Sequence, residues 1–135
     1  MKHDGIIIFS SGDTSIKVHN LDTYKEIYHF KDAHDQIISS VILSPDKLSL
    51  ISASHDMSIK VWDIHEYKSS PLHHLEKVHT EKIKSIDISS DSNFILSTGE
   101  KGSIKVSSIK EKLQVHQIPK NPQSTLKIFL RRSHR

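Results

Sequence analysis

Residues 51–63 read Ile-Ser-Ala-Ser-His-Asp-Met-Ser-Ile-Lys-Val-Trp-Asp and form two short runs separated by a polar turn. In the second run, Ile59 and Val61 share one face and Lys60 lies on the other, because successive side chains of a strand alternate. Two such runs around a turn are typical of adjacent β-strands. The segment therefore predicts a pair of strands with one apolar face.

The sequence Ser-Ile-Lys-Val from this segment occurs three times in the chain. It stands at 15–18, 58–61 and 103–106, with spacings of 43 and 45 residues. His34 and His79 are a second pair of landmarks, again 45 residues apart. Self-similarity at a fixed period is the signature of repeat architectures. We therefore expect copies of one structural unit.

Each period contains short runs separated by turn residues. A further landmark is the turn at 44–47 (Ser-Pro-Asp-Lys), which we align with 90–93 (Ser-Asp-Ser-Asn). Four short strands in about 40–45 residues are typical of one propeller blade. We predict an all-β partial β-propeller of about three four-stranded antiparallel blades. The expected strand segments are 41–43, 48–54, 58–63 and 72–78 in the second period, and 85–89, 94–98, 103–108 and 113–118 in the third.

The composition agrees with this fold class. The 135 residues include 19 Ile and 6 Val but only 2 Ala, which speaks against a helical bundle. The sequence has no run of 18 apolar residues, so it predicts no membrane-spanning helix. The first residues also lack the apolar core of a secretory signal. The absence of cysteine excludes disulfides and thiolate metal sites. We expect a soluble intracellular protein, cytoplasmic or nuclear.

The positive charge is concentrated at the end of the chain. Residues 1–110 carry a net charge of −2, whereas residues 111–135 carry +5 and include all three arginines. A nucleic-acid-binding domain more often carries a basic patch on its folded body. We therefore do not expect nucleic acid as the main partner, and the basic end is typical of a solvated terminus.

Residues 51–63 resemble the WD-repeat (WD40) β-propeller family, and the resemblance covers roughly residues 6–118. The structural tetrad of that family maps onto His34, Ser52, Asp56 and Trp62. The chemistry of this set is intelligible, since a buried carboxylate needs donors and an indole N–H needs an acceptor. The resemblance implies a network that ties the strands of a blade to the loop entering it.

The other two periods depart from the tetrad pattern. In the first, Asp13 is kept, but Phe9 and His19 stand where Ser and Trp are expected. In the third, His79 and Ser97 are kept, while Lys101 replaces Asp and Ser107 replaces Trp. Gly99 and Gly102 flank this altered turn, and we expect them to let the chain reverse without the carboxylate.

The repeats divide the chain into blades at 6–31 (incomplete), 34–78 (complete) and 79–118 (degenerate), within 1–118, followed by a basic tail or the start of another blade at 119–135. The first period begins with a second strand. Closed propellers generally have about four to eight blades. Three interpretations stay open: part of a longer propeller, a truncated product, or a subunit that completes its ring with other chains. Further blades or self-association are therefore expected, and we expect the isolated chain to associate through uncovered apolar faces.

We predict no catalytic, cofactor-binding or metal site. A zinc site needs three or four ligands that converge on one ion. We do not expect this of His73, His74, Glu76 and His79, because adjacent residues of a strand point to opposite faces. Ser52, His34 and Asp56 are the residue types of a hydrolase triad, but the resemblance makes the serine structural. The four glycines form no phosphate-binding motif.

The resemblance implies a non-enzymatic scaffold that mediates protein–protein interactions. Candidate partner-binding residues lie in predicted exposed loops, which project from rigid blades: Asp22, Tyr24, His55, Met57, Tyr67 and Lys68. One alternative is a substrate-recognition subunit of a ubiquitin ligase, although residues 62–65 (Trp-Asp-Ile-His) end in histidine where that class often has arginine. Another is nucleic-acid or membrane-surface binding through the tail at 125–132, which also fits a first strand of a further blade.

Overall fold

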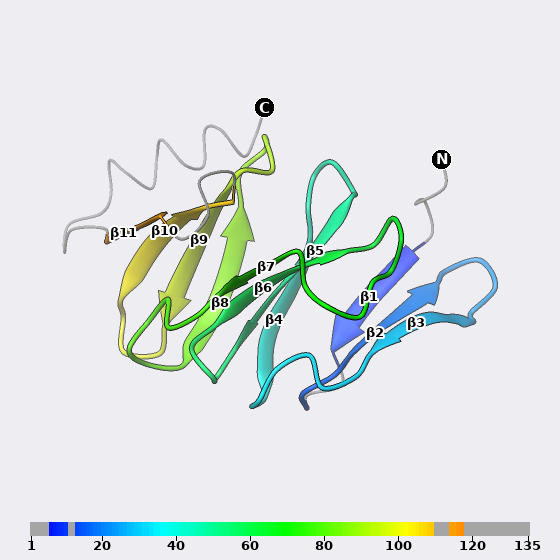
Figure 1. The fold of residues 1–135 in the computed structure, drawn as a ribbon, viewed down its shortest axis with the longest axis horizontal. Helices are drawn as coiled ribbons and strands as arrows, with labels where there is room; N and C mark the ends of the chain where they lie inside the picture. Colours follow the sequence, from blue (N-terminus) through cyan, green and yellow to red (C-terminus); the bar gives the residue numbers. More distant parts are fainter. Residues whose placement is uncertain (1–5, 11–12, 110–113, 118–135) are drawn as a thin grey trace.

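The computed structural model describes residues 6–10, 13–109 and 114–117. Three antiparallel sheets stand side by side in the order in which they occur along the chain (Figure 1). The all-β fold and the partial propeller are confirmed, and the described residues contain no helix. The strands are β1 (Ile6–Ser10), β2 (Ile16–Asn20) and β3 (Glu26–Phe30); β4 (Ile38–Leu43), β5 (Ser49–Ser54), β6 (Ile59–Asp63) and β7 (His73–Leu75); and β8 (Ile83–Ile88), β9 (Phe94–Gly99), β10 (Ile104–Ser108) and β11 (Gln114–Gln117).

Consecutive strands are neighbours in every sheet, as expected for a meander. The first sheet has the order β1-β2-β3, and the other two have four strands each. The Ser-Ile-Lys-Val repeats lead into β2, β6 and β10, which are equivalent strands. The predicted tail at 119–135 lies outside the described residues.

The turns after β4 and β8 correct the predicted alignment by one residue. Ser44 N donates to Ser49 O, and Ser89 N donates to Phe94 O, both at 2.9 Å. In each turn the serine hydroxyl also donates to the aspartate two residues later. Residues 44–47 therefore correspond to 89–92 and not to 90–93. The spacing is then 45, as for the histidines.

Two apolar cores lie between the three sheets. The alternation of the strands sends Leu50 and Trp62 toward the first sheet, where they pack with Phe30 and Val18. The opposite face of the second sheet packs on the third, through residues that include Ile51, Ala53, Ile59, Val61, Ile83 and Ile95. Each sheet is therefore held by burying a face against its neighbour, as in other repeat proteins.

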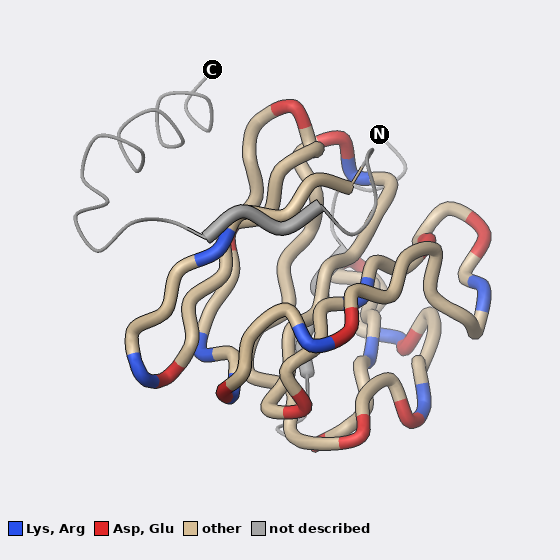
Figure 2. Tube along the Cα trace, turned by 60° about the vertical axis from the view of Figure 1, so that its left-hand side comes forward, with Lys and Arg blue, Asp and Glu red and all other residues tan. Residues whose placement is uncertain are grey.

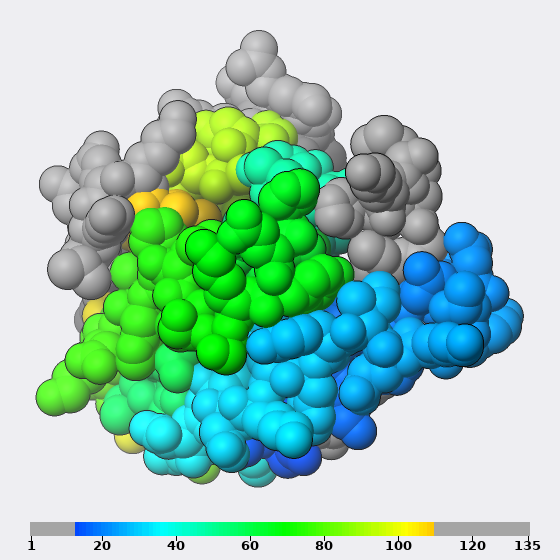
Figure 3. Space-filling model, turned by 45° about the vertical axis from the view of Figure 1, so that its right-hand side comes forward, coloured from blue at the N-terminus to red at the C-terminus, as the bar shows by residue number. Residues whose placement is uncertain are grey.

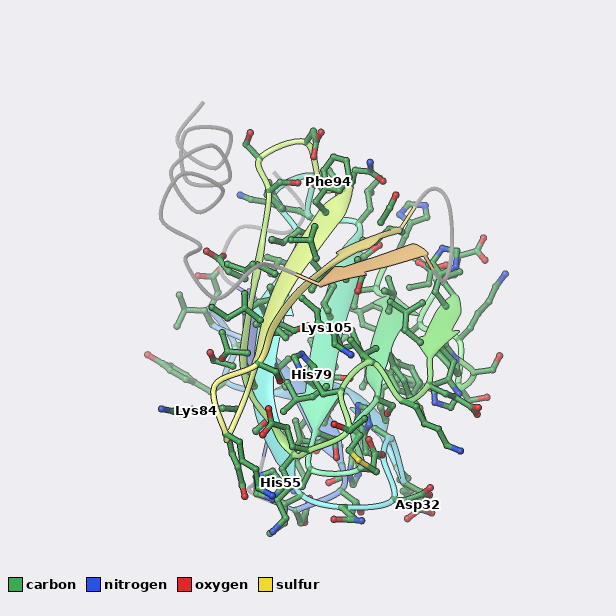
Figure 4. All side chains as sticks on the ribbon, turned by 90° about the vertical axis from the view of Figure 1, so that its left-hand side faces the viewer. Asp32, His55, His79, Lys84, Phe94 and Lys105 are labelled. Atoms are coloured by element: carbon green, nitrogen blue, oxygen red, sulfur yellow. The ribbon has the colours of Figure 1, made fainter. Side chains whose placement is uncertain are left out.

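The connections between strands gather at two opposite ends of the sheets. Figure 4 shows Phe94, just after the β8–β9 turn, at one end, and His55 and Asp32 at the other. The β2–β3, β4–β5 and β6–β7 connections lie at the end of Phe94, because strands alternate in direction. We call this the hairpin end. The β5–β6 and β9–β10 turns lie at the other end, together with the loops that enter β4 and β8.

Candidate functional site

The residues of the predicted tetrad lie together between the first and second sheets. The Asp56 carboxylate accepts hydrogen bonds from Asp35 N (3.1 Å), Ser58 N (2.9 Å) and Ser58 Oγ (2.6 Å), and lies 3.0 Å from His34 Nδ1. Asp56 belongs to the β5–β6 turn, whereas Asp35 and His34 belong to the loop that enters β4. The network therefore ties this loop to the turn.

The bonding partners of His34 determine which of its nitrogens carries the proton. Its Nδ1 faces a carboxylate, which only accepts, so Nδ1 donates. Burial lowers the pKa of His34, against the opposing effect of Asp56, so the neutral ring is favoured. Its Nε2 then accepts from Ser52 Oγ at 2.7 Å, and Ser52 Oγ accepts from Trp62 Nε1 at 2.9 Å. The four side chains thus form one directional chain of hydrogen bonds.

This chain has the connectivity of a Ser-His-Asp hydrolase triad, but its serine is enclosed. Ser52 has 0% of its surface exposed, and its hydroxyl already accepts from the indole of Trp62. A nucleophile must reach the substrate carbonyl, and such an enclosed hydroxyl is out of reach. The geometry therefore suits a structural role, in which a carboxylate, a histidine and serines hold a loop and a turn together. We call such a network a bracket.

Asp56 keeps its charge in this partly enclosed place. Burial alone raises the pKa of a carboxyl, but the hydrogen bonds from Ser58 and Asp35, with the nearby His34, outweigh burial and lower the pKa of Asp56. A lowered pKa means that the ionised form is stabilised by folding. Asp56 is therefore an anionic anchor for the turn and the loop around it.

The same bracket also attaches the second sheet to the first. Lys60 Nζ donates to Ala33 O at 2.6 Å and lies 5.8 Å from the centroid of the Trp62 ring. The Trp62 ring packs on Phe30 of β3 with 4.9 Å between centroids. Residues of β6 therefore hold both the entering loop and the neighbouring sheet.

The third sheet contains an equivalent network with a carboxylate from another segment. Glu81, in the loop that enters β8, accepts from Lys101 N (2.6 Å), Ser103 N (3.2 Å) and Ser103 Oγ. His79 lies 2.6 Å from Ser103 Oγ and 2.8 Å from Ser97 Oγ. The hydrogen bond from Ser103 lowers the pKa of Glu81, and burial lowers the pKa of His79. In the second sheet the carboxylate comes from the turn, and here it comes from the loop.

This finding corrects the expected role of the two glycines. The turn at 99–102 does not reverse without a carboxylate, because Glu81 supplies one. Gly99 makes room for it, since a Cβ at this position would overlap the Glu81 side chain. Gly102 has a positive φ of 98°, and its counterpart Met57 has 73°. Only Gly102 therefore uses the conformational freedom of glycine.

The position of Trp62 is taken by Ser107 in the third sheet. Ser107 has 0% of its surface exposed, and within the described part of the chain its hydroxyl has no hydrogen-bond partner. In the first sheet, Asp13 accepts from Ser15 N (2.8 Å) and Ser15 Oγ (2.9 Å), as Asp56 does from Ser58. Phe9 pairs with Lys17 as Ser52 pairs with Lys60. A carboxylate that binds the serine before the next strand therefore occurs in all three sheets, whereas the full tetrad is complete in the second.

The six candidate loop residues fall at both ends of the sheets. Asp22, Tyr24, Tyr67 and Lys68 lie at the hairpin end, whereas His55 and Met57 lie in the β5–β6 turn at the opposite end. Asp22, Tyr24 and Lys68 are exposed, but Tyr67, His55 and Met57 are half-buried, contrary to expectation. Tyr67 packs on Tyr28 with 5.4 Å between ring centroids, and the backbone N–H groups of His55 and Met57 donate to Ile37 O and Ser54 O.

The histidines that drew attention in the sequence do not converge. His79 is engaged by two serines, and His74 Nδ1 lies 3.8 Å from Glu76 Oε1. No three His, Asp or Glu side chains group as metal ligands within the described residues. The same residues include no helix that is long and apolar enough to cross a membrane.

Comparison with protein families matches residues 24–63 and 69–106 to the WD domain, G-beta repeat (WD40). These two segments make up more than half of the chain. The chain belongs to the WD40 family. The three sheets are therefore WD40 blades, called below the first (β1–β3), second (β4–β7) and third (β8–β11) blade. WD40 repeats indicate a protein-interaction scaffold, and the family is generally non-enzymatic.

Two curated relatives match part of the repeats. The chain is 38% identical over 63 residues to nuclear distribution protein nudF of Aspergillus flavus and to that of Aspergillus oryzae. The match covers 45% of this chain and 14% of each relative. It therefore supports the repeat fold, and the chain spans only a small part of these relatives.

Proposed function

We propose that this chain is a non-enzymatic WD40 scaffold that binds a protein partner through its hairpin end. The observation that carries the proposal is the set of exposed apolar side chains at this end. Tyr24 is 82% exposed, and three leucines in the same connections are about half exposed: Leu21, Leu48 and Leu72. Exposed apolar groups that gather on one surface mark interaction sites, and tyrosine is enriched among interface anchors.

Hydrogen bonds within the β2–β3 connection fix the backbone at Tyr24. Asn20 Oδ1 accepts from Asp22 N (2.8 Å) and Thr23 N (3.0 Å), and Asn20 O accepts from Tyr24 N (2.8 Å). Figure 3 shows this connection projecting from the first blade. A loop whose backbone is already ordered loses less entropy on binding. The hairpin therefore suits a preorganised contact.

The connections of the first two blades form one surface. Tyr67, in the β6–β7 connection, packs on Tyr28 of the first blade, and burial raises the pKa of Tyr67. Ile64 N donates to Leu48 O at 3.2 Å, which joins the β6–β7 and β4–β5 connections. A partner can thus contact several connections at once without first ordering them.

The charges of the described body favour a protein over a polyanion. Acidic and basic residues are mixed along the connections, and neither kind gathers on one side (Figure 2). Lys68, for example, is paired with Glu66 at 3.1 Å. A polyanion-binding surface collects basic side chains on one face. The mixed charges instead resemble the polar rim of a protein interface.

We also propose that the three blades act within a larger propeller or assembly. Closed propellers have about four to eight blades, and the described residues form three. Nearest-neighbour packing then continues beyond these sheets. Partner binding through the hairpin end is compatible with such a ring, because the enclosed cores between blades are formed by the sheet faces and leave the exposed residues of this end free.

The proposed surface is tested by quantitative affinity capture with matched variants. Tyr24→Asp alters the hairpin end, and Thr80→Asp places the same charge on an exposed residue at the opposite end. We expect proteins enriched by the wild-type chain to be retained by Thr80→Asp and lost with Tyr24→Asp. Circular dichroism must show that both variants are folded. Equal recovery with both variants, or loss with Thr80→Asp alone, would contradict the proposal.

A further inference from the structure

The second blade receives the start of the third at a defined place. Ile83 and Val78 pack in one core with Ile59, and all three are almost fully enclosed. Val78 N donates to Met57 O at 2.9 Å, and Ser39 Oγ donates to Ile83 O at 2.6 Å. The loop and the first strand of a blade thus dock on the strands and the β-turn of the blade before it.

The first blade receives the second in the same way. Ala33 and Ile38, the counterparts of Val78 and Ile83, pack in one core with Ile16, the counterpart of Ile59. Ile38 N donates to Asp13 O at 3.0 Å, in the turn that precedes β2. The apolar part of this docking contact therefore occurs twice in the chain with equivalent residues, although the hydrogen bonds beside it differ.

The third blade has a cavity at the same place. Its volume is about 280 Å³, and it is lined by residues that include Lys84, Thr98, Gly102 and Ile104. These residues stand 45 positions after Ser39, Ala53, Met57 and Ile59, the docking residues of the second blade. Thr98 and Ile104 are half-buried, whereas their counterparts Ala53 and Ile59 are fully enclosed. Figure 4 shows Lys84 at the lateral edge of this blade, in the half nearer His55.

We propose that residues 123–130 of this chain dock in this cavity, with Ile128 in the place that Ile83 occupies on the second blade. Residues 125–128 (Thr-Leu-Lys-Ile) repeat residues 80–83 (Thr-Glu-Lys-Ile) at the spacing of 45 that separates the second and third blades, with three of four residues identical. The segment that matches the docking sequence therefore stands where the repeat requires it.

The length of the connection favours docking within one chain. β3 ends at Phe30, eight residues before Ile38, and β7 ends at Leu75, eight residues before Ile83. β11 ends at Gln117, eleven residues before Ile128. Phe30 and Leu75 pair with Ile16 and Ile59, whereas Gln117 pairs with Lys105, one position short of the equivalent Ile104. Nine residues therefore match the connection that occurs twice in the fold, and eleven are sufficient. The cavity lies on a blade face and not at the hairpin end, so this proposal is independent of partner binding through the hairpin end.

A paramagnetic label tests the proposal on the full chain. The chain has no cysteine, so Lys127→Cys gives one attachment point for a nitroxide. The counterpart of Lys127 is Lys82, which is exposed, so the label leaves docking intact. We expect the label to broaden the amide signals of Thr98 and Gly102 and to leave the signals of the β2–β3 connection unchanged. No broadening in the third blade would overturn the proposal.

Two controls identify the docked segment and its origin. Ile128→Asp in the labelled chain should restore the signals, whereas Thr125→Asp should not, because its counterpart Thr80 is exposed. Equal broadening in both variants would overturn the role of Ile128. In a mixture of isotope-labelled chains with nitroxide-labelled chains, we expect no broadening. Broadening in the mixture would show that a second copy fills the cavity and would overturn docking within one chain.

Thiol reactivity gives a second test that needs no assigned spectrum. With Thr98→Cys as the single cysteine, a tail docked for about nine-tenths of the time slows labelling about tenfold, because only the undocked fraction reacts. We expect Ile128→Asp to remove this protection. Thr23→Cys, in the exposed β2–β3 connection, should react at the same rate with either residue at 128. Equal labelling rates of Thr98→Cys with and without Ile128→Asp would overturn the proposal.

Discussion

The carboxylates of Asp56 and Glu81 stabilise the same junction from opposite sides. Asp56 lies in a turn and binds the amide of Asp35 in the facing loop, whereas Glu81 lies in a loop and binds the amide of Lys101 in the facing turn. Each also binds the backbone N–H and hydroxyl of the serine that precedes the next strand. Hydrogen bonds to an ionised acceptor are stronger than neutral ones. Two sequence arrangements therefore produce one bracket.

Removal of either carboxylate should destabilise the chain more than removal of the lysine at the Asp56 position of the third blade. Asp56→Ala leaves its donors without an acceptor, at a cost of about 1–3 kcal/mol in the free energy of unfolding. Glu81→Ala should also lower this free energy, while Lys101→Ala should have little effect, because only its backbone N–H joins the network. Urea titrations of the three variants give the comparison. If Lys101→Ala were as damaging as Glu81→Ala, the assignment of Glu81 would be wrong.

The stability of the fold should decrease in mild acid because of His34. Burial lowers its pKa below the usual 6.5, against the nearby Asp56 and together with Lys60 and His74, so the unfolded chain binds a proton that the folded chain excludes. The free energy of unfolding therefore falls as the pH drops below about 6.5, by at most about 1.4 kcal/mol per pH unit for this group. Asp56, whose pKa is lowered, contributes a further loss below its usual 3.8.

Urea titrations between about pH 7.5 and pH 5 measure this dependence. His34→Gln should lower the stability at neutral pH and reduce the loss on acidification. His79, whose pKa is also lowered by burial, leaves a residual slope in that variant. An unchanged slope in His34→Gln would show that His34 is not the titrating group.

Glu81 of the third blade illustrates which details of a site cannot be predicted from the sequence. The tetrad positions are predicted by alignment with a family pattern, and that pattern places the carboxylate in the turn. Glu81 is 20 residues away from Lys101, and only folding brings them together. The one signal available was the combined change to Gly99 and Lys101 with Ser103 retained. Its meaning depends on the space that Gly99 leaves for the Glu81 side chain.

The strands of each blade follow from local pattern far better than the packing between blades. The alternation of apolar and polar residues at 58–63 predicts β6, and the turn residues on either side of 48–54 mark the ends of β5. These two strands are therefore predictable from the sequence alone. The pairing of Trp62 with Phe30 could not, because it depends on how two sheets stack. The shift of the β8–β9 turn by one residue was missed because adjacent serines at 89 and 90 offer two alignments, and only the backbone bond of Ser89 decides between them.

Trp62 should couple the second blade to the first through packing more than through its hydrogen bond. Trp62→Phe keeps an aromatic ring against Phe30 but removes the donor to Ser52, at a cost of about 1 kcal/mol. Trp62→Ala should cost about 3–5 kcal/mol, because it empties a core position. Thermal unfolding followed by circular dichroism compares the two variants. Tryptophan fluorescence is not suitable, because both variants lose the only tryptophan of the sequence. Similar losses for the two variants would contradict the packing role.

The third blade carries a hydroxyl whose removal should improve stability. Ser107 is enclosed without a hydrogen-bond partner among the described residues, where the second blade has Trp62. Ser107→Ala removes an unsatisfied polar group and should raise the free energy of unfolding by about 1 kcal/mol. Ser97→Ala, which deletes a hydroxyl bound to His79, should lower it. A loss of stability in Ser107→Ala, measured in urea, would mean that its hydroxyl has a partner after all.

The molecule as a whole is a stack in which each blade covers one face of the next. In such quasi-one-dimensional proteins, stability is the sum of terms within repeats and terms between neighbours. The outer face of the third blade, with Leu96, Ile104 and Val106, is half-buried, whereas the equivalent face of the second blade is enclosed. Whether this face is covered by other residues should therefore determine how strongly the chain self-associates in solution.

Deletion of residues 119–135 should increase self-association. The proposed docking of Ile128 covers part of the outer face of the third blade, and its loss exposes apolar surface and strand edges that promote association. Sedimentation velocity on the full chain and on residues 1–118 at equal concentrations measures the difference. Identical distributions for the two proteins would contradict the protective role of the tail.

Hydrogen exchange in Asp56→Ala and Glu81→Ala tests most directly whether two different carboxylates hold equivalent brackets. Asp56→Ala should release the protection of amides bound by Asp56, those of Asp35 and Ser58, and leave Lys101 and Ser103 protected. Glu81→Ala should give the converse pattern. Exchange opens locally where a cooperative unit loses its contacts, so each variant should act first on its own junction. If both variants exposed the same amides, or neither exposed its own, the account of the two brackets would be contradicted.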